Sequence, residues 1–229
     1  MKISLKIITL IFIIPCFLIS QSNPYNLKIV SNLEEYKKLV QENPNKLLID
    51  IKYYIPEIVL DIRYATTDNF TKEQIYTLPK AFLRKPVADS LKKVQMELSK
   101  IGLSIKIFDA YRPYSATLKF YEVYPDTTYV AAPWRGSRHN YGCAVDLTLI
   151  ELKTGRELRM PTEFDDFTSK AHHNYNDLPK DVIENREILR KVMEKYGFKI
   201  YPDEWWHYDF YDWQNYEILD IPFEKLVNN

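Results

Sequence analysis

The sequence predicts a single α+β domain in which helices flank a central, mainly antiparallel sheet. Segments with strand-like alternation and segments with helical spacing both occur along the chain. A length of 229 residues suits one domain with a sizeable core. A hydrophobic content of 46% and an aromatic content of 14% exclude a disordered chain. No internal repeat or linker divides the sequence.

The first 22 residues have the composition of an export signal. Lys2 and Lys6 accompany an almost wholly apolar run from residue 7 to residue 19, and small serines follow it. The run is shorter than the roughly 20 apolar residues that a membrane span needs. We therefore expect residues 1–22 to be removed and residues 23–229 to form the mature domain. A retained signal anchor is the alternative.

The signal and the charge balance together indicate location and partners. We expect an exported bacterial protein, periplasmic or extracellular, with no stable membrane association after signal removal. Removal of residues 1–22 leaves 29 basic and 31 acidic residues, a net charge of −2. This balance gives no electrostatic attraction to nucleic acid, so we expect none to bind. Cys143 is then the only mature cysteine and is expected to be a buried small hydrophobe.

Strands are predicted where Ile, Leu, Val and Tyr concentrate or alternate, namely in residues 46–54, 59–64, 103–108, 144–149 and 206–210. Helices are predicted where apolar residues recur three or four positions apart, from about residue 33 to 40, 87 to 101, 115 to 124 and 185 to 196. Ser31 and Glu34 form a capping-box pair before the first helix. Gly102 suits the position after the second helix. Residues 124–135 and 164–178 are expected to be loops.

Residues with metal chemistry concentrate in two short stretches, 137–146 and 204–207. His139, Asp146 and His207 offer two imidazoles and one carboxylate, a set that suits a catalytic zinc ion with an open position for water. Glu204, three residues before the last histidine, is the candidate general base. A single histidine or aspartate is more often packed or at the surface than bound to metal. Four such residues in two compact clusters favour a metal site, expected in a cleft at the sheet.

The spacing constrains how these residues meet. At about 3.3 Å per residue an extended chain would hold His139 and Asp146 more than about 20 Å apart, so the chain must fold back between them. Gly142 lies where a residue tolerant of unusual φ is needed. We expect His139 in a loop and Asp146 on a strand. Because Glu204 and His207 would face opposite sides of a regular strand, Glu204 is expected at a bend just before it.

Three motifs occur together: Ser-x-His-x-x-Gly-x-Ala-x-Asp-Leu-Thr-Leu from Ser137, Asp-Ala-Tyr-Arg-Pro from Asp109, and Glu-Trp-Trp-His from Glu204. Together they resemble the zinc D-alanyl-D-alanine dipeptidases of the vancomycin-resistance type, over roughly residues 60–223. Related zinc D,D-carboxypeptidases share the His-x6-Asp and Glu-x-Trp-His parts. The Asp-Leu-Thr-Leu ending and the Asp-x-Tyr-Arg-Pro segment favour the dipeptidases.

The resemblance implies hydrolysis of a small D,D-dipeptide, D-alanyl-D-alanine, to two D-alanines in cell-wall peptide metabolism, with Glu204 as the base. Arg112, expected at a strand end, would stabilise the developing oxyanion. The alternative for Arg112 is a surface arginine or an ion pair with Asp109. One zinc ion per chain would be held by His139, Asp146 and His207.

Two further positions are assigned to substrate binding by the resemblance. Asp165 matches a residue that faces the substrate's amino end, and Ser137 matches a binding serine. Asp166 stands where relatives often carry an aromatic residue, so the sequence does not decide what forms this wall of the pocket. His172 and His173 are expected to be structural or hydrogen-bonded rather than metal ligands.

Two other functions remain open at this stage. A zinc D,D-carboxypeptidase or endopeptidase acting on peptidoglycan stem peptides would suit an exported location, and substrate length would distinguish it. A non-catalytic zinc-binding module that recognises cell-wall peptides would have no need of a base such as Glu204. The oligomeric state is open.

Overall fold

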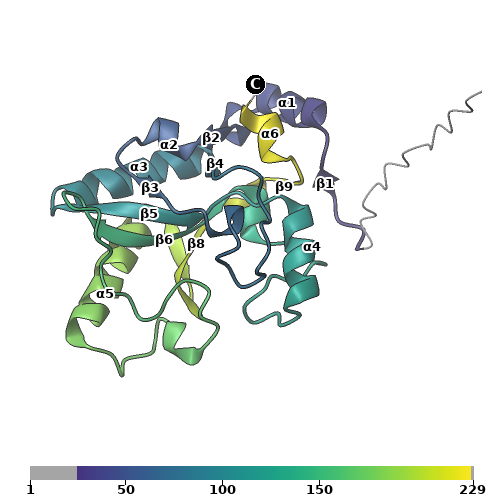
Figure 1. Ribbon diagram of the computed structural model, residues 1–229. Helices are drawn as coiled ribbons and strands as arrows, with labels where there is room; N and C mark the ends of the chain where they lie inside the picture. Colours follow the sequence, from purple (N-terminus) through teal and green to yellow (C-terminus); the bar gives the residue numbers. More distant parts are fainter. Residues whose placement is uncertain (1–24, 228–229) are drawn as a thin grey trace, which may run out of the picture.

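A five-stranded sheet lies at the centre of the structure, a computed structural model that describes residues 25–227 (Figure 1). The predicted signal, residues 1–22, lies outside the described residues. Within this five-stranded sheet only β3 and β5 pair in parallel, and the other neighbouring strands are antiparallel. This confirms the predicted α+β class and the mainly antiparallel sheet. The strands in sheet order are β3 (Val59–Leu60), β5 (Leu103–Asp109), β6 (Ala144–Glu151), β8 (Glu204–Phe210) and β7 (Phe198–Tyr201).

Two small sheets and a set of helices complete the domain (Figure 1). The parallel pair is β1 (Ile29–Val30) with β9 (Ile218–Leu219), and the antiparallel pair is β2 (Leu48–Asp50) with β4 (Phe82–Arg84). The helices are α1 (Leu33–Glu42), α2 (Ile51–Tyr54), α3 (Lys85–Ser99), α4 (Tyr114–Val123), α5 (Lys180–Lys195) and α6 (Phe223–Val227). Within residues 25–227, no helix has the length and apolar character that crossing a bilayer requires.

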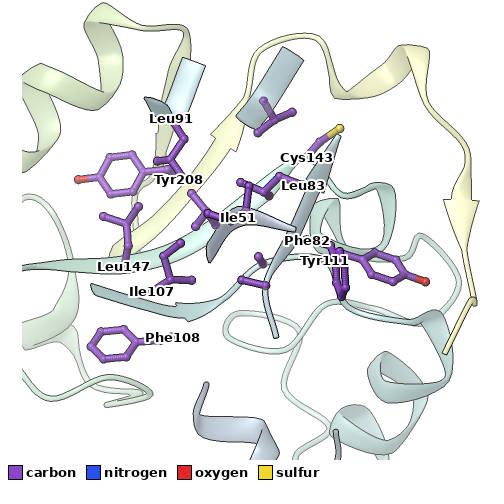
Figure 2. Close-up of a cluster of buried hydrophobic side chains, with 14 of the residues drawn as sticks. Ile51, Phe82, Leu83, Leu91, Ile107, Phe108, Tyr111, Cys143, Leu147 and Tyr208 are labelled. Atoms are coloured by element: carbon purple, nitrogen blue, oxygen red, sulfur yellow. The ribbon is translucent and has the colours of Figure 1, made fainter. Parts of the chain in front are cut away.

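Part of the core lies between the central sheet and helices α3 and α5, which also contact each other. Leu91 of α3, Leu147 of β6 and Tyr208 of β8 belong to one buried cluster (Figure 2). Side chains alternate along a strand, so Asp146 and His207 point away from this cluster. The alternation thus separates the apolar core from the polar site.

Several local predictions agree with the structure and others need correction. Gly102 follows α3 with a φ of 76°, as expected of a residue that ends a helix. Cys143 is buried and free, and burial raises the pKa of its thiol, which confirms its expected role as a small hydrophobe. The N-cap of α1 is Asn32 instead of Ser31, since Asn32 Oδ1 accepts a hydrogen bond from the Glu34 backbone N–H at 2.8 Å.

The predicted strands at residues 46–54 and 59–64 are both shorter in the structure. The first ends at Asp50, whose side chain accepts a hydrogen bond from the Tyr53 backbone N–H at 3.3 Å and caps α2. The second ends at Leu60, and a 3₁₀ turn follows at Arg63–Ala65. In both places a local turn interrupts an apolar run that would otherwise favour a strand.

Candidate functional site

A capped 3₁₀ turn, Arg138–Tyr141, carries the first candidate ligand. Ser137 Oγ accepts a hydrogen bond from the His139 backbone N–H at 3.3 Å and so fixes the start of the turn. Gly142 ends it with a φ of 72°, and a Cβ there would lie 2.7 Å from the side chain of Leu48. The positive φ therefore favours glycine here, and a larger residue would also have to displace the end of the Leu48 side chain. His139, predicted in a loop, lies in this capped turn within the connection from α4 to β6.

Asn140 ties the turn to the end of β5 and to α4. Its Nδ2 donates to Arg112 O and to Thr117 Oγ1, both at 2.9 Å, and its Oδ1 accepts from the Ser137 N–H at 2.7 Å. The Arg112 N–H donates to His139 O at 3.1 Å. Asn140 is fully buried with its amide bonded on both sides, an arrangement that fixes local geometry. No sequence motif marked it, because Arg112, just after β5, and Thr117 of α4 lie more than 20 residues away.

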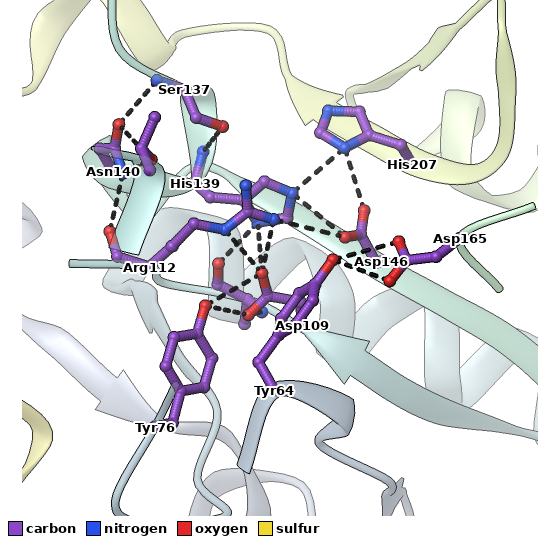
Figure 3. A network of polar contacts seen from close by, with 12 residues as sticks. Tyr64, Tyr76, Asp109, Arg112, Ser137, His139, Asn140, Asp146, Asp165 and His207 are labelled. Carbon is purple, nitrogen blue, oxygen red and sulfur yellow. Dashed lines mark hydrogen bonds and ion pairs between the residues drawn. The ribbon is translucent and has the colours of Figure 1, made fainter. Parts of the chain in front are cut away.

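Strands β6 and β8 bring the other two candidate ligands together, because Asp146 and His207 are direct cross-strand partners. Asp146 Oδ1 lies 3.0 Å from His207 Nδ1, and Asp146 Oδ2 lies 3.3 Å from His139 Nε2 (Figure 3). His139 Nε2 and His207 Nδ1 are 3.2 Å apart. The three predicted ligands thus converge on one point. Burial opposes ionisation of Asp146, but the two imidazoles hold its pKa well below the usual range.

The outer hydrogen bonds of the two imidazoles show that this point suits a cation. His139 Nδ1 lies 2.6 Å from the carbonyl oxygen of Ala110, which can only accept, so Nδ1 donates and Nε2 keeps its lone pair. His207 Nε2 lies 2.9 Å from Asp209 Oδ1 and donates to it, so the neutral imidazole carries its lone pair on Nδ1. Two lone pairs and a carboxylate then face one another, an arrangement that a metal ion stabilises.

The distances between these donor atoms also fit zinc. A tetrahedral zinc ion bound at about 2.0–2.1 Å by nitrogen and oxygen ligands separates those ligands by about 3.3 Å. The two nitrogens are 3.2 Å apart, and each lies close to a different oxygen of Asp146, at 3.0 Å for His207 Nδ1 and 3.3 Å for His139 Nε2. Two imidazoles and one carboxylate are a known donor set for catalytic zinc. The residues present therefore fit the ion that the sequence predicted.

Glu204 lies beside the candidate ligands, with its Oε2 3.9 Å from His207 Nδ1. Its position results from an irregular register, because Ile200 pairs with Tyr208 while the next residue, Tyr201, pairs with Glu204. The extra residues on β8 form a bulge that turns Glu204 to the face of His207. The predicted bend is therefore a bulge within the hairpin and not a bend before it. Burial raises the pKa of Glu204 to about 8, against an opposing effect of His207.

Arg112 is buried, and its guanidinium is paired with Asp109. Arg112 Nε and Nη2 donate to Asp109 Oδ2 at 3.0 and 2.7 Å, and Tyr76 Oη donates to the same carboxylate at 3.0 Å. Arg112 Nη2 also lies 4.0 Å from Asp146 Oδ2, and the guanidinium lies 4.6 Å from the centre of the Phe120 ring. The ion pair considered as an alternative is present, and it holds Arg112 next to the candidate ligands.

Asp165 reaches the same site from the loop between β6 and α5. Tyr64 Oη donates to this carboxylate and lies 3.1 Å from both of its oxygens (Figure 3). Burial and the charge of Asp146 raise the pKa of Asp165 well above the usual range, so a cation beside it would be stabilising. Ser137 lies near the ligands as predicted, but its hydroxyl also caps the turn that carries His139.

These groups line a cavity of about 270 Å³ at the face of the sheet. This volume lies at the lower end of small-molecule pockets and suits a ligand smaller than a typical drug. The loop predicted at residues 124–135 supplies one wall of the cavity through Thr127, Thr128, Tyr129, Val130, Ala131 and Ala132. The lining also includes Asp165, Glu204 and Trp206.

Two arginines that the sequence motifs did not mark also line this cavity and are exposed. Arg138 lies 3.6 Å from Asp209 Oδ2 and 4.7 Å from the centre of the Trp213 ring. The side chain of Arg135 has neither a hydrogen bond nor an ion pair with any residue in the range 25–227. The available signal was their position in the four residues before His139, where Gly136 and Ser137 separate the two arginines.

His172 and His173 lie apart from the candidate metal ligands. His172 Nδ1 is 3.6 Å from Asp203 Oδ1, and the ring of His173 contacts Tyr208 edge-on with 6.1 Å between centroids. Among the residues that the structure describes, the group able to hold a metal contains neither. This geometry agrees with the structural role expected for the pair.

Comparisons with known proteins define the class. Residues 45–223 match the M15 peptidase family described as D-ala-D-ala dipeptidase. The D-alanyl-D-alanine dipeptidase of Escherichia coli K12 is 31% identical over 181 residues, which cover 79% of this chain and 93% of that protein. The D-alanyl-D-alanine dipeptidase of Enterococcus faecalis is 33% identical over 172 residues, 66% of this chain and 85% of that protein. The chain therefore belongs to the D-Ala-D-Ala dipeptidase family of M15 peptidases.

Two solved structures show partial similarity to this chain. One is the vancomycin-resistance D,D-dipeptidase VanXYg in complex with a D-Ala-D-Ala phosphinate analogue, with a TM-score of 0.38 and 18% identity over 72% of this chain and 66% of that chain. Another is the vancomycin-resistance D,D-pentapeptidase VanY in complex with Zn(II), with a TM-score of 0.39 and 16% identity over 58% of this chain and 75% of that chain.

Proposed function

We propose that this protein is a zinc-dependent dipeptidase that hydrolyses D-alanyl-D-alanine to two D-alanine molecules. The observation that carries the proposal is the convergence of two imidazole lone pairs and a carboxylate beside a buried glutamate, within a small cavity. Family membership and the names of the relatives support the substrate. The small cavity favours a dipeptide over a stem peptide.

One zinc ion per chain would be held by His139 Nε2, His207 Nδ1 and the carboxylate of Asp146. A bound zinc ion polarises the scissile carbonyl and lowers the pKa of a water molecule. The carbonyl of Ala110 and the carboxylate of Asp209 hold the two imidazoles in the tautomers that ligation needs.

Glu204 takes a proton from the attacking water and delivers it to the leaving amine. Its raised pKa, about 8, makes the carboxylate an effective acceptor that can release the proton again, and a nearby cation draws this pKa downward. Arg112, oriented by Asp109, donates hydrogen bonds to the developing oxyanion.

The two ends of the dipeptide carry opposite charges and need different partners. Asp165, held by Tyr64 on the cavity wall, binds the ammonium group. Arg135, a cavity-lining cation with no partner among residues 25–227, binds the carboxylate together with the hydroxyl of Ser137.

The direct test compares substrates of two lengths. Zinc-loaded protein is incubated with free D-Ala-D-Ala and with a stem pentapeptide that ends in D-Ala-D-Ala, and the products are identified by mass. We expect D-alanine from the free dipeptide. Release of D-alanine from the pentapeptide alone would establish a D,D-carboxypeptidase instead. Stoichiometric zinc with no hydrolysis of either peptide would favour a non-catalytic binding module.

The matched variant for this assay is Glu204→Ala. It should retain one zinc ion per chain, because Glu204 is not among the ligands, and lose about 10²- to 10⁴-fold in turnover, as expected for a general base. Unchanged turnover would remove Glu204 from the mechanism.

We also propose that the protein is exported in bacteria and that residues 23–229 are its mature form. The proposal depends on the basic and apolar pattern of residues 1–22. Intact-mass measurement of the protein recovered from a bacterial periplasm or culture medium tests it. A chain that still begins at Met1 would contradict cleavage.

A further inference from the structure

A buried arginine lies behind the site without a carboxylate partner. Arg186 of α5 is 1% exposed, and among residues 25–227 no aspartate or glutamate forms an ion pair with it. The adjacent carboxylate, Glu187, is bonded by Arg190 instead, with 3.2 Å between Arg190 Nε and Glu187 Oε1. Burial lowers the pKa of Arg186, which shows that its charge is poorly solvated there. A buried guanidinium without a carboxylate partner is costly for stability. A role other than stability must therefore explain why Arg186 is buried at this place.

All hydrogen bonds that the Arg186 guanidinium makes within the described chain go to one short segment, residues 172–176. Arg186 Nη1 donates to the carbonyl oxygens of His172 and Tyr175 at 3.3 and 2.7 Å. Arg186 Nη2 donates to Asn176 Oδ1 at 3.2 Å. The planar guanidinium therefore binds three acceptors of this segment at once and fixes its path over α5.

The same segment contacts the turn that leads directly into Glu204. The His173 backbone N–H donates to Pro202 O at 2.9 Å, and His172 Nδ1 lies 3.6 Å from Asp203 Oδ1. Pro202 and Asp203 form the turn between β7 and β8, and the next residue is Glu204.

Glu204 needs such support because it lies outside the regular ladder. The register between β7 and β8 is interrupted at Tyr201, so the strand pairing that orients His207 does not by itself orient Glu204. We propose that Arg186 is a positioning residue that sets the place of the Glu204 carboxylate through segment 172–176 and the 202–203 turn. The proposal extends the proposed function, in which Glu204 is the base. In Figure 1, α5 and the loop before it lie on the same side of the sheet.

The substrate-binding carboxylate is held independently of this chain of contacts. Asp165 lies seven residues before His172 and is bonded by Tyr64, which comes from a different part of the molecule. Loss of the Arg186 contacts should therefore affect the chemical step more than substrate binding.

The test replaces Arg186 and compares it with the neighbouring arginine on the same helix. Arg186→Met removes the three hydrogen bonds and keeps an apolar stem. We expect kcat to fall about 10- to 100-fold, because misplacement of a reacting group by about 1 Å has an effect of this size. We expect KM to change less than about threefold, with one zinc ion per chain retained.

Arg190→Met is the matched control, since Arg190 bonds only Glu187 and Glu194 among the described residues. It should keep kcat within about twofold. Arg186→Lys can still donate to carbonyl oxygens, although without the planar fork, and should recover part of the lost kcat.

A purely structural role for Arg186 predicts a different outcome. In that case zinc content and kcat would fall together, and kcat per zinc-loaded chain would stay at the wild-type value. That result, or a wild-type kcat in Arg186→Met, would overturn the proposal.

Hydrogen exchange of the backbone amides of Tyr201 and of residues 203–205 gives a readout that needs no substrate. These amides should exchange faster in Arg186→Met than in Arg190→Met, and equal rates would count against the positioning role. If the wild-type protein fails to hydrolyse D-Ala-D-Ala while the two variants still differ in exchange rate, the proposed function alone is refuted.

Discussion

The two sides of the cavity are built in different ways. On the ligand side, Asp146 and His207 are direct partners in an antiparallel ladder, and His139 lies in a turn that is capped and bonded to Arg112 in the segment after β5. On the substrate side, loops form the wall, and Asp165 is hydrogen-bonded by the single side chain of Tyr64. The comparison indicates that backbone pairing determines the ligand geometry, whereas substrate contacts depend on individual side chains. Substitutions on the two sides should therefore have separable effects.

The strongest test of the ligand side is Asp209→Asn. The amide keeps the size of the side chain but weakens the hydrogen bond from His207 Nε2, which fixes the tautomer of that ligand. We expect zinc affinity to fall about 10- to 100-fold, the usual effect of losing such a partner. Competition with a chelator measures it. Asp212→Asn, three residues along and bonded to Asn215, is the control. Equal affinities in the two variants would show that Asp209 does not orient His207.

On the substrate side, Asp165→Asn should raise KM for D-Ala-D-Ala about tenfold. Loss of a charge-assisted hydrogen bond to the ammonium group, about 1.5 kcal/mol, is the cause. Zinc content should not change, because Asp165 is not among the ligands. Asp166→Asn is the matched control, since Asp166 is adjacent and does not line the cavity. Release of zinc by Asp165→Asn would show that the two sides are not separable.

The smallest effect is expected from Arg135→Gln. Arg135 is exposed, so its interaction with the substrate carboxylate is screened by solvent and contributes less than about 1 kcal/mol. KM should rise about two- to fivefold at low salt. The difference from the wild type should shrink as ionic strength increases. A KM that is the same in both proteins at low salt would exclude Arg135 as the carboxylate partner.

The parts of the molecule that were predictable from sequence are those that local patterns encode. The five predicted strand regions and four predicted helices occur in the predicted order, with shifts at their ends. For example, α5 begins at Lys180, five residues before the predicted start at 185. The candidate ligands His139, Asp146 and His207 were marked by short motifs, and the structure brings them together.

The parts that were not predictable depend on partners distant in the sequence. Asn140 bonds residues on α4 and at the end of β5, and Arg186 bonds a loop more than nine residues away. The bulge at Glu204 results from the register between β7 and β8, which periodicity within one strand does not encode. At Asp50 a single capping side chain outweighs an apolar run that would otherwise continue as a strand.

If the proposed metal ion binds, the direct pairing of Asp146 with His207 makes its capture a check on correct folding. Because side chains alternate, a slip of one residue between β6 and β8 would turn one of these two donors into the core and leave the other exposed. An ion that binds only the correctly aligned sheet lowers the free energy of that alignment alone. Metal supply during folding would then influence how much of the newly made chain reaches its proper strand alignment.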